Sequence, residues 1–419
     1  AQAFSARAAT AAYLGGGPVG APGAPLPRPR LCACRPRGQA AGHMGSCLGG
    51  LAGPVPRTPK KGFKVCVCGA AGASGQPLCL LMALDPRVWE LSVYDLTIAM
   101  TPAQGIGADL GHIERKCKVT AHCLDTTQKP VDHLRDCLTG CDLVLVPVGV
   151  PSKGRARSDL LTVNANITRT IVEACAKFCP RAVVGLIVNP MTSIVPAMAK
   201  LYELWGLDPR RICGVTTLDV VRANKFVHEA TGCPIEKVGV PVVGGFSGMM
   251  RSESAVPLFS QDAAARGLSH EQREQLIGRL HDASEEVSAA KNGKGVATLS
   301  AAYASGRFGQ AVLAGLSGER TTETAFVKTG GDVYQDFEFF ATKVTFGPNG
   351  VERVHPIGPI TDDEKKRLDL VAATLREEID EGVRYATKNA RESGLTNVPK
   401  ALESNAAENA VQSNSRRGA

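Results

Sequence analysis

The sequence predicts an α/β fold in which a doubly wound parallel sheet is joined to a second, mixed α/β region. Short apolar segments alternate with helical segments through the first half of the chain, which is the pattern of a parallel sheet covered by helices. A glycine-rich stretch directly follows the first apolar segment and precedes a helical one. In the second half, helical periodicity dominates. Ligands of such a sheet bind at the carboxyl ends of its strands.

The first half supplies four apolar strands. The first strand, residues 63–68, leads into a glycine-rich stretch at 69–75 and then an apolar helix to about residue 84. Further strands are expected at 91–95, 142–149 and 183–190, and a helix at 163–178. The last two strands are almost uninterrupted apolar runs, which indicates strands that are buried on both faces.

The second half is expected to be mostly helical. Helices are predicted at 218–230, 270–290 and 297–313, strands at 324–328 and 337–346, and a long closing amphipathic helix at 361–388. Beyond residue 391 the chain is rich in Ser, Asn, Ala and Glu and has no core-forming pattern, so we expect a flexible tail at 392–419.

Residues 1–61 have the composition of an organellar transit peptide or a disordered extension. They are rich in Ala, Gly, Pro and Arg, and the first 60 contain seven basic and no acidic residues. The many Gly and Pro residues would break the amphipathic helix of a mitochondrial presequence, which favours a chloroplast address. The alternative is an unstructured arm that is retained and contacts a partner.

The remainder of the chain is almost neutral. Of the net charge of +8, only +1 remains outside the first 60 residues, as 41 basic against 40 acidic side chains. A near-neutral body argues against nucleic acid as a partner, because such binding depends on neutralising phosphates. No apolar run reaches the length of a transmembrane segment.

The 14 cysteines form no C-x-x-C pair and no Cys/His cluster with the spacing of a metal site, so no metal is predicted. Cys66 and Cys68 alternate within the first strand. We expect most thiols to be free in a reducing compartment. A redox switch at Cys137/Cys141 or Cys175/Cys179 is the alternative, although the helical i, i+4 spacing opposes disulfide closure.

The glycine-rich stretch indicates a dinucleotide site. Gly69, Gly72 and Gly75 lie between a strand and a helix, where backbone N–H groups can approach a pyrophosphate. Asp95 stands 20 residues after Gly75 at the end of the next strand, where a carboxylate accepts hydrogen bonds from ribose hydroxyls and favours NAD over NADP. The alternative is a tight structural turn capped by a solvent-exposed Asp.

These observations predict four regions. Residues 1–61 are the transit peptide or extension, 62–212 the NAD-binding domain with a Rossmann fold, 213–391 a C-terminal α/β domain, and 392–419 the tail.

A spaced set of motifs resembles the NAD-dependent malate dehydrogenases of organellar and bacterial type. Besides the glycine-rich stretch and Asp95, the matching segments are 108–113 (ADLGHI), 164–165 (NA), 189–190 (NP), 214–224 (GVTTLDVVRAN) and 297–300 (ATLS). The resemblance covers residues 63–388. It implies a lactate/malate dehydrogenase-like fold, that is, a Rossmann domain plus a mixed α/β substrate domain, and a homo- or heterodimer packed through helices.

The resemblance assigns roles to five residues. Arg222 matches the arginine that holds the substrate carboxylate, and Asp219 the carboxylate that orients the catalytic histidine. Arg157 matches the second arginine of the substrate loop, Asn164 a cofactor contact, and Asn189 a residue near both nicotinamide and substrate.

The sequence departs from the family at the reacting centre. Phe246 occupies the position of the catalytic histidine, and a phenyl ring cannot take the hydroxyl proton of a 2-hydroxy acid. Ser152 occupies the position of the first loop arginine, and Lys153 or Arg155 would compensate only as point charges out of register. The segments after Phe246 and after Asp95 each look several residues longer than the family norm.

The remaining polar groups offer no clear replacement base. In the absence of the histidine, Asp219 and Arg222, at i and i+3 of a helix, are able to pair with each other and become structural. His228 is nine residues from Asp219 on the opposite side of that helix, and we interpret it as a surface residue. His112 is expected to be a dimer-contact or core residue.

Two functional hypotheses follow. The first is a catalytically inactive malate dehydrogenase relative that serves as a structural or NAD-sensing subunit of an organellar complex. The resemblance makes a partnership with a membrane-bound FtsH-like AAA ATPase plausible, because plastid members of the family serve as non-catalytic partners of such complexes. The second is an active NAD-dependent dehydrogenase of malate or another 2-hydroxy acid, with water or a distant group as base.

Overall fold

The computed structural model describes residues 62–96, 99, 101–124, 130–150, 156–247 and 254–390. The chain divides into two units, Ala1–Arg57 and Thr58–Ala419, and every described residue belongs to the second. The predicted leader and tail lie outside the described residues. So do Ser152, Lys153, Arg155 and the longer segment after Ser247.

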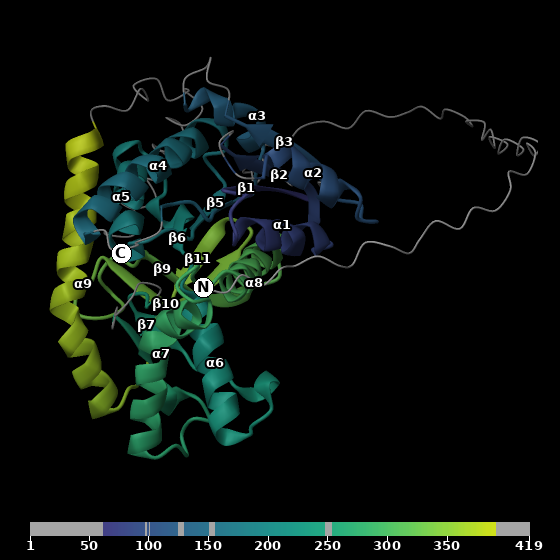
Figure 1. The fold of residues 1–419 in the computed structure, drawn as a ribbon. Helices are drawn as coiled ribbons and strands as arrows, with labels where there is room; N and C mark the ends of the chain where they lie inside the picture. The colour runs from purple at the N-terminus through teal and green to yellow at the C-terminus, as the bar shows by residue number, and fades with distance from the viewer. Residues whose placement is uncertain are drawn as a thin grey trace, which may run out of the picture. The chain divides into compact units, whose positions relative to one another are not determined.

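The described strands form one sheet of eleven in which a parallel half continues into an antiparallel half (Figure 1). The parallel half has the order β3 (Lys118–Cys123), β2 (Val88–Asp95), β1 (Phe63–Cys68), β4 (Leu143–Val146), β5 (Val183–Leu186) and β6 (Ile212–Gly214). The antiparallel half follows with β9 (Thr321–Lys328), β10 (Phe339–Gly347), β7 (Val242–Gly244) and β8 (Ala255–Pro257), while β11 (Gly350–Val354) also pairs with β10. The strand order reverses between β1 and β4, so a crevice for a ligand is expected at the carboxyl ends of these two strands.

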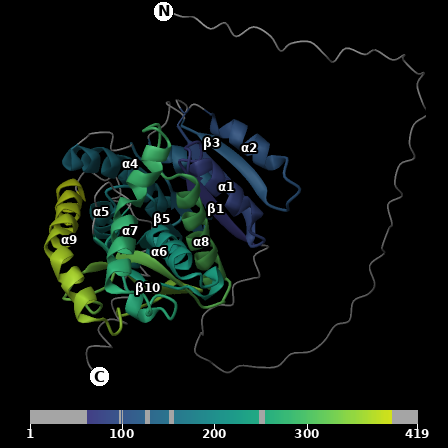
Figure 2. The same cartoon turned by 60° about the horizontal axis from the view of Figure 1, so that its bottom comes forward.

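Helices cover both faces of the sheet (Figures 1 and 2). They are α1 (Gly75–Leu84), α2 (Ala103–Gly111), α3 (Arg135–Leu138), α4 (Arg157–Phe178), α5 (Met191–Leu204), α6 (Thr217–Thr231), α7 (His270–Ala290), α8 (Leu299–Leu316) and α9 (Asp362–Asn389). Helix α8 packs against α1, and α9 packs along α5. The predicted fold class, a doubly wound sheet followed by a mixed α/β region, is confirmed.

The predicted strands differ from the observed ones mainly in length. All four residues of β4 and all four of β5 are buried, as the apolar runs indicated. The runs were predicted to continue to residues 149 and 190, but β4 ends at Val146 and β5 at Leu186. The apolar residues beyond these ends belong to loops that line a cavity, where burial does not require strand pairing.

Capping residues explain where the two longest helices of the second half begin. Ser269 caps α7 and Thr361 caps α9, and in each case the side chain accepts the N–H three residues on, from Gln272 or Glu364. Each of these third residues returns a hydrogen bond to the N–H of the cap, which completes a capping box. The predicted helix at 361–388 is therefore observed with almost the expected bounds.

Helix α9 approaches α5 very closely. A Cβ atom on Gly382 would lie 2.0 Å from the carbonyl oxygen of Ser193, so only glycine fits there. Leu368, Leu375 and Ile379 of α9 are buried in the same hydrophobic cluster as residues of α5 and β1. The last described helix therefore completes the core beside the parallel half of the sheet.

All eleven cysteines among the described residues are free thiols, and eight of them are buried. The sulfur atoms of Cys66 and Cys68 on β1 lie 3.8 Å apart. Burial raises the pKa of the Cys79 and Cys213 thiols, so these groups stay protonated and unreactive. A redox role for Cys137/Cys141 or Cys175/Cys179 stays a prediction.

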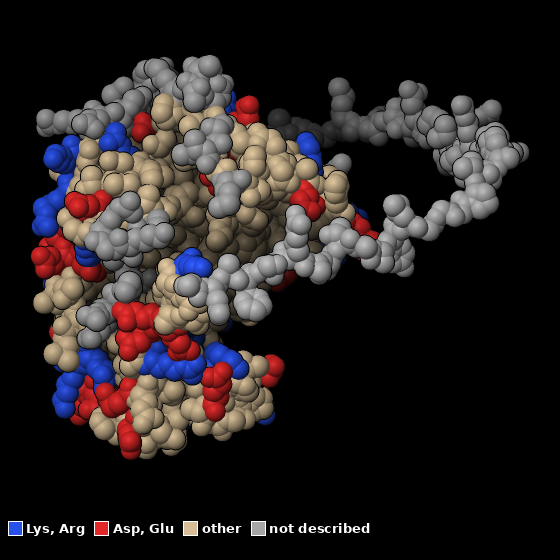
Figure 3. All heavy atoms as spheres, in the orientation of Figure 1, with Lys and Arg blue, Asp and Glu red and all other residues tan. Residues whose placement is uncertain are grey.

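Within the described part of the chain, no helix has both the length and the apolar composition needed to cross a membrane. On the face shown in Figure 3, acidic and basic side chains intermingle along α9 and around α6 and α7. That face has mixed charge, in agreement with the near-neutral body expected from the sequence.

Candidate active site

The loop between β1 and α1 depends on two glycines, Gly69 and Gly75, that no other residue could replace. Gly69 has a positive φ of 100°, and a Cβ at Gly75 would lie 2.0 Å from the carbonyl oxygen of Gly69. The N–H groups of Gly69 and Ala70 donate to the carbonyl oxygen of Tyr94 at 2.8 and 3.1 Å. The loop is therefore fastened to the end of β2, with the first turn of α1 directly behind it. Gly72, whose N–H donates to Gly69, lies within the same turn.

Asp95 lies beside this loop at the end of β2. Its Oδ2 accepts the N–H of Ala71 at 2.7 Å, and its Oδ1 accepts the N–H of Leu96 at 2.7 Å. A carboxylate oxygen has two acceptor sites, so Asp95 retains capacity to accept bonds from the hydroxyls of a ribose. The geometry suits both a ribose-binding carboxylate and a residue that caps a structural turn. Asp95 stabilises the turn and also presents a negative charge beside it.

Asn164 is buried and uses its amide to hold two strand ends together. Its Oδ1 accepts the N–H of Val150 at 2.8 Å, and its Nδ2 donates to the carbonyl oxygen of Asn189 at 2.7 Å. Val150 follows β4, and Asn189 follows β5 with a cis bond to Pro190. Asn164 was predicted to contact the cofactor, which stays a prediction; its hydrogen bonds position the backbone around the crevice.

A cavity of about 270 Å³ lies at the carboxyl ends of β4 and β5. It extends from Ser74, in the glycine-rich loop, to Phe246 and to Ser284 on α7. Asn164 and Asn189 are both in its wall. Among the residues that the structure describes, its lining contains only apolar, serine, glycine and asparagine side chains and no ionisable group.

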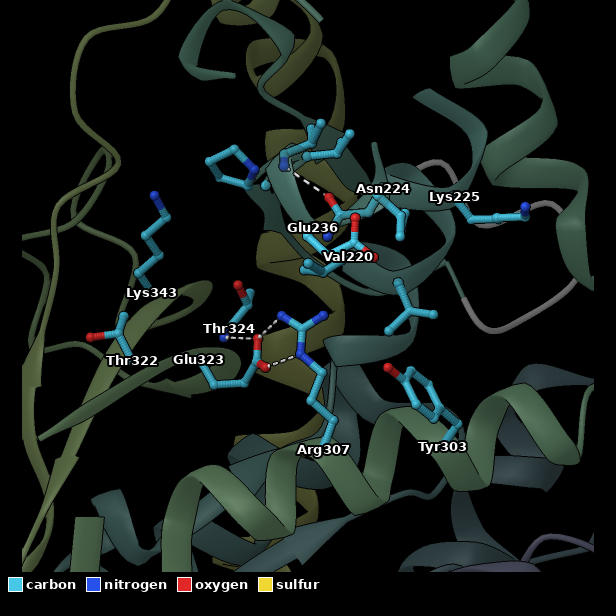
Figure 4. Close-up of a pocket in the computed structure, with 16 residues that line it drawn as sticks. Val220, Asn224, Lys225, Glu236, Tyr303, Arg307, Thr322, Glu323, Thr324 and Lys343 are labelled. Carbon is cyan, nitrogen blue, oxygen red and sulfur yellow. Dashed lines mark hydrogen bonds and ion pairs between the residues drawn. The ribbon is translucent and has the colours of Figure 1, made fainter. Parts of the chain in front are cut away.

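A larger cavity, of about 680 Å³, lies elsewhere, between α6, α8 and strands β9 and β10 (Figure 4). Its centre holds a paired Arg307 and Glu323, with Nε to Oε2 at 2.6 Å. Lys225 on its rim is paired with Glu229. This cavity contains none of the residues predicted for catalysis or cofactor binding, so the smaller cavity is the candidate site.

Phe246 follows β7 and is half-buried in the wall of the smaller cavity. Its N–H donates to the hydroxyl of Ser254 at 3.2 Å, and that hydroxyl donates back to the carbonyl oxygen of Phe246 at 3.2 Å. The backbone here is thus held firmly, with an aromatic ring where the resemblance places the proton acceptor.

Asp219 is completely buried near the start of α6, and its partner is Ser247. The hydroxyl of Ser247 donates to Oδ1 at 2.5 Å, and the N–H of Ser247 donates to Oδ2 at 3.0 Å. Burial raises the pKa of the Asp219 carboxyl, and the two bonds from Ser247 partly oppose this. Asp219 does not line the cavity, and its carboxylate already accepts two hydrogen bonds from Ser247.

Arg222 is also buried, one turn further along α6. Its two terminal nitrogens each lie 3.4 Å from the hydroxyl of Ser284, whose residue lines the cavity. Burial lowers the pKa of the Arg222 guanidinium, and the charge of Asp219 opposes this. Among the described residues, Asp219 and Arg222 form no ion pair with each other, contrary to the expected alternative that they would pair directly.

Arg157 begins α4 and is bound by residues of two other helices. Its Nη2 lies 3.2 Å from Glu378 and donates to the hydroxyl of Ser193 at 2.7 Å, while its Nη1 pairs with Glu381. Arg157 does not line the cavity. The guanidinium predicted to hold substrate is thus bound by carboxylates of the chain itself.

Within the described ranges, no histidine lines the cavity. His228 is partly buried and bonds to the carbonyl oxygen of Cys233 at 2.7 Å, and His112 is exposed at the end of α2, not in the core. His281 on α7, which was not predicted from the sequence, is bonded to the carbonyl oxygen of Ala255 at 2.9 Å. The charge of His281 acts to lower the pKa of Asp219, so this histidine is close to the buried carboxylate. The one feature of the sequence that could have identified His281 is its i, i+3 spacing to Ser284, which places both residues on the same face of α7.

The sequence of the chain matches a known protein family over most of the described residues. Residues 63–214 match the NAD-binding domain of lactate/malate dehydrogenases, and residues 216–386 match the α/β C-terminal domain of the same family. The chain is 42% identical over 328 residues to the mitochondrial malate dehydrogenase of Eucalyptus gunnii, which covers 78% of this chain and 90% of that protein. It is also 42% identical over 338 residues to the mitochondrial malate dehydrogenase of Chlamydomonas reinhardtii, which covers 80% of this chain and 86% of that protein.

Solved structures agree with the fold. The malate dehydrogenase of Cryptosporidium parvum matches with a TM-score of 0.63 and 25% identity, over 77% of this chain and 99% of that one. The enzyme of Picrophilus torridus matches with a TM-score of 0.67 and 20% identity, over 78% and 99%. The chain therefore belongs to the NAD-dependent malate dehydrogenases of the lactate/malate dehydrogenase family.

Proposed function

We propose that this malate dehydrogenase relative binds NAD(H) but does not interconvert malate and oxaloacetate at ordinary enzymatic rates. One observation carries the proposal: Phe246 lines the cavity in place of a proton acceptor, and no ionisable side chain is present in the described part of the lining. Oxidation of a 2-hydroxy acid requires that a base take the hydroxyl proton as hydride leaves. Removal of such a base commonly costs about 10²–10⁴ in rate.

The state of the neighbouring residues supports the loss of proton transfer. Asp219, the orienting carboxylate of the family, accepts two hydrogen bonds from Ser247. The substrate arginine Arg222 is bonded to Ser284, and Arg157 to α9. The polar groups left by the missing histidine thus have partners within the chain.

Cofactor binding is retained in this proposal because its geometry is intact. The glycine-rich loop is closely packed, and Asp95 lies beside it with free acceptor capacity. An acidic residue at this place favours NAD over NADP, because it would repel a 2′-phosphate.

An active dehydrogenase is the second candidate. Asp219 and Arg222 are both present and buried on one face of α6, which is the arrangement an active family member would use. This candidate requires water or a group outside the described residues as base, and Ser152 in the substrate loop would then favour a 2-hydroxy acid other than malate.

The cellular role in our proposal is that of a structural or NAD-sensing subunit of an organellar complex. The relatives named above are mitochondrial enzymes, which supports an organellar location. The chloroplast, an FtsH-like AAA ATPase as partner, and a homo- or heterodimer are the finer parts of this proposal, and they rest on the leader composition and the family resemblance.

The test compares the full chain with a Phe246→His, Ser152→Arg double variant. We expect the wild type to bind NADH, seen as enhanced nicotinamide fluorescence, with negligible oxaloacetate reduction, and the double variant to gain about 10²-fold or more in rate. A Phe246→Leu, Ser152→Arg variant is the matched control, because leucine also lacks a proton acceptor and should give no gain. Ordinary turnover by the wild type would refute the proposal.

A further inference from the structure

We propose that Glu378 and Glu381 of α9 determine ligand specificity, because they occupy the carboxylate-binding nitrogens of Arg157 and so exclude small dicarboxylate anions. The inference rests on the proposed function, in which the NAD site is kept and malate turnover is lost. It adds a second cause for the loss of malate turnover. That cause lies on α9, a helix that is remote in sequence from the cavity.

Arg157 shares a helix face with two residues that line the cavity, although it does not line the cavity itself. Leu160 and Asn164 line the cavity and follow Arg157 by three and seven residues on α4, so the three share one helix face. Met191, which also lines the cavity, precedes Ser193 by two residues, and Ser193 accepts a hydrogen bond from Arg157. Release from α9 would leave the arginine side chain free to adopt another rotamer on this face of α4.

The two glutamates bind the guanidinium from one side. Glu378 and Glu381 are three residues apart and therefore lie on the same face of α9. Glu378 lies 3.2 Å from Nη2, Glu381 pairs with Nη1, and the hydroxyl of Ser193 also lies 3.3 Å from Glu381. A planar guanidinium binds a carboxylate through a pair of N–H groups. In Arg157 the N–H groups that an anionic ligand would need are therefore already bonded to the two glutamates.

The close approach of α9 makes this arrangement possible. Gly382 follows Glu381 directly and touches the backbone of Ser193. A larger residue there would move α9 outwards and carry the carboxylates away from Arg157. The contact between α5 and α9 thus places negative charge beside the substrate arginine.

The charges of the cluster add a second barrier. Two carboxylates face one guanidinium, so the cluster carries a net charge of −1. The side chains are 31%, 18% and 29% exposed for Arg157, Glu378 and Glu381, so solvent screens them only in part. An incoming dicarboxylate would meet this negative charge and would have to displace an existing partner of the arginine.

The same contacts would be expected if the cluster had only a structural role and fastened α9 to α4. A measurement of anion binding distinguishes that role from the exclusion of dicarboxylates. The experiment titrates the full chain with malonate, with and without NADH, by isothermal titration calorimetry. It compares the wild type with a Glu378→Gln, Glu381→Gln variant. The matched control is Glu377→Gln, Asp380→Asn, which removes two carboxylates from exposed positions of the same helix.

We expect malonate to bind at least about tenfold more tightly to the Glu378→Gln, Glu381→Gln variant than to the wild type or the control. Addition of Arg157→Gln should abolish the gain. Equal malonate affinity in all variants, or no binding by any, would overturn the proposal, even if the thermal midpoint falls. NADH affinity is measured separately: its absence would refute the proposed function, while the titration without NADH would still test the role of α9.

Discussion

The hydroxyl of Ser247 lies 2.5 Å from Oδ1 of Asp219, and the N–H of the same serine lies 3.0 Å from Oδ2. Ser247 directly follows Phe246, so the residue after this cavity-lining ring supplies the buried carboxylate with both of these hydrogen bonds. A buried carboxylate without such donors would be costly. The segment that places Phe246 in the cavity wall thus also stabilises the buried aspartate.

Ser247→Ala should destabilise the fold. The substitution removes the hydroxyl donor from a fully buried carboxylate, and we expect a loss of about 1–3 kcal/mol in the free energy of unfolding. Urea denaturation followed by circular dichroism measures this loss. Ser158→Ala, at an exposed position of α4, is the control and should change stability by less than about 0.5 kcal/mol. Equal effects of the two substitutions would contradict the importance of the Ser247 bond.

The stability should depend on pH through Asp219. Its pKa is raised above the ordinary value of 3.8, chiefly by burial, so the folded state binds the proton more tightly than the unfolded state. The contribution of this group is therefore largest below about pH 3.8 and is lost as the pH rises towards the raised pKa.

This dependence is measured as the difference in unfolding free energy between the wild type and Asp219→Asn across that pH range. Asparagine does not titrate, and the other carboxylates cancel in the difference. We expect the stability of the wild type relative to the variant to decrease as the pH rises, and then to level off. A constant or increasing difference would show that Asp219 titrates normally or with a lowered pKa.

Gly75→Ala should disrupt the cofactor loop. The added Cβ would lie 2.0 Å from the carbonyl oxygen of Gly69, so the turn must open. We expect a loss of NADH binding by at least about tenfold, together with lower thermal stability. Gly105→Ala is the matched control, because that Cβ meets no atom within 4 Å and lies within α2. The control should keep NADH affinity, and unchanged affinity in Gly75→Ala would place the cofactor elsewhere.

Asp95→Asn should weaken the preference for NADH over NADPH. The substitution removes the negative charge that disfavours a 2′-phosphate and weakens bonds to ribose hydroxyls. Hydrogen bonds to charged groups contribute about 1.5–3 kcal/mol, so the ratio of NADH to NADPH affinity should fall by about tenfold or more. Fluorescence titration with both cofactors gives the ratio. If the ratio does not change, Asp95 serves only to cap the turn at Ala71.

Local patterns in the sequence predicted four of the six strands in the parallel half of the sheet, namely β1, β2, β4 and β5, and the glycine-rich loop. The apolar runs of β1, β4 and β5 and the spacing from Gly75 to Asp95 involve neighbouring residues or adjacent strands. Strands β6, β7 and β8 were missed because each has only three residues, too few to show a period. The edge strand β3 was missed because it mixes polar and apolar residues without burial on both faces.

The partners of the site residues could not be predicted in the same way. Phe246 was identified by resemblance, but the bond from Ser247 to Asp219 joins residues 28 apart, and the pair of Arg157 with Glu381 joins residues 224 apart. Such contacts depend on how α4, α6 and α9 pack, and no periodicity within one segment encodes them. Helix spacing alone allowed Asp219 to pair with Arg222, but among the described residues each has another partner, Ser247 or Ser284.

The packing of α9 on α5 has a consequence for synthesis of the chain. Leu368, Leu375 and Ile379 belong to the same hydrophobic cluster as β1 and α5, although Leu368 follows the end of α5 by 164 residues (368 − 204) and the end of β1 by 300 (368 − 68). Domains at the N-terminus generally begin to fold while the ribosome is still adding residues. Here the first half cannot complete its core until the last described helix has been released from the exit tunnel. During translation, the apolar face of α5 that α9 covers in the folded protein is therefore exposed to water.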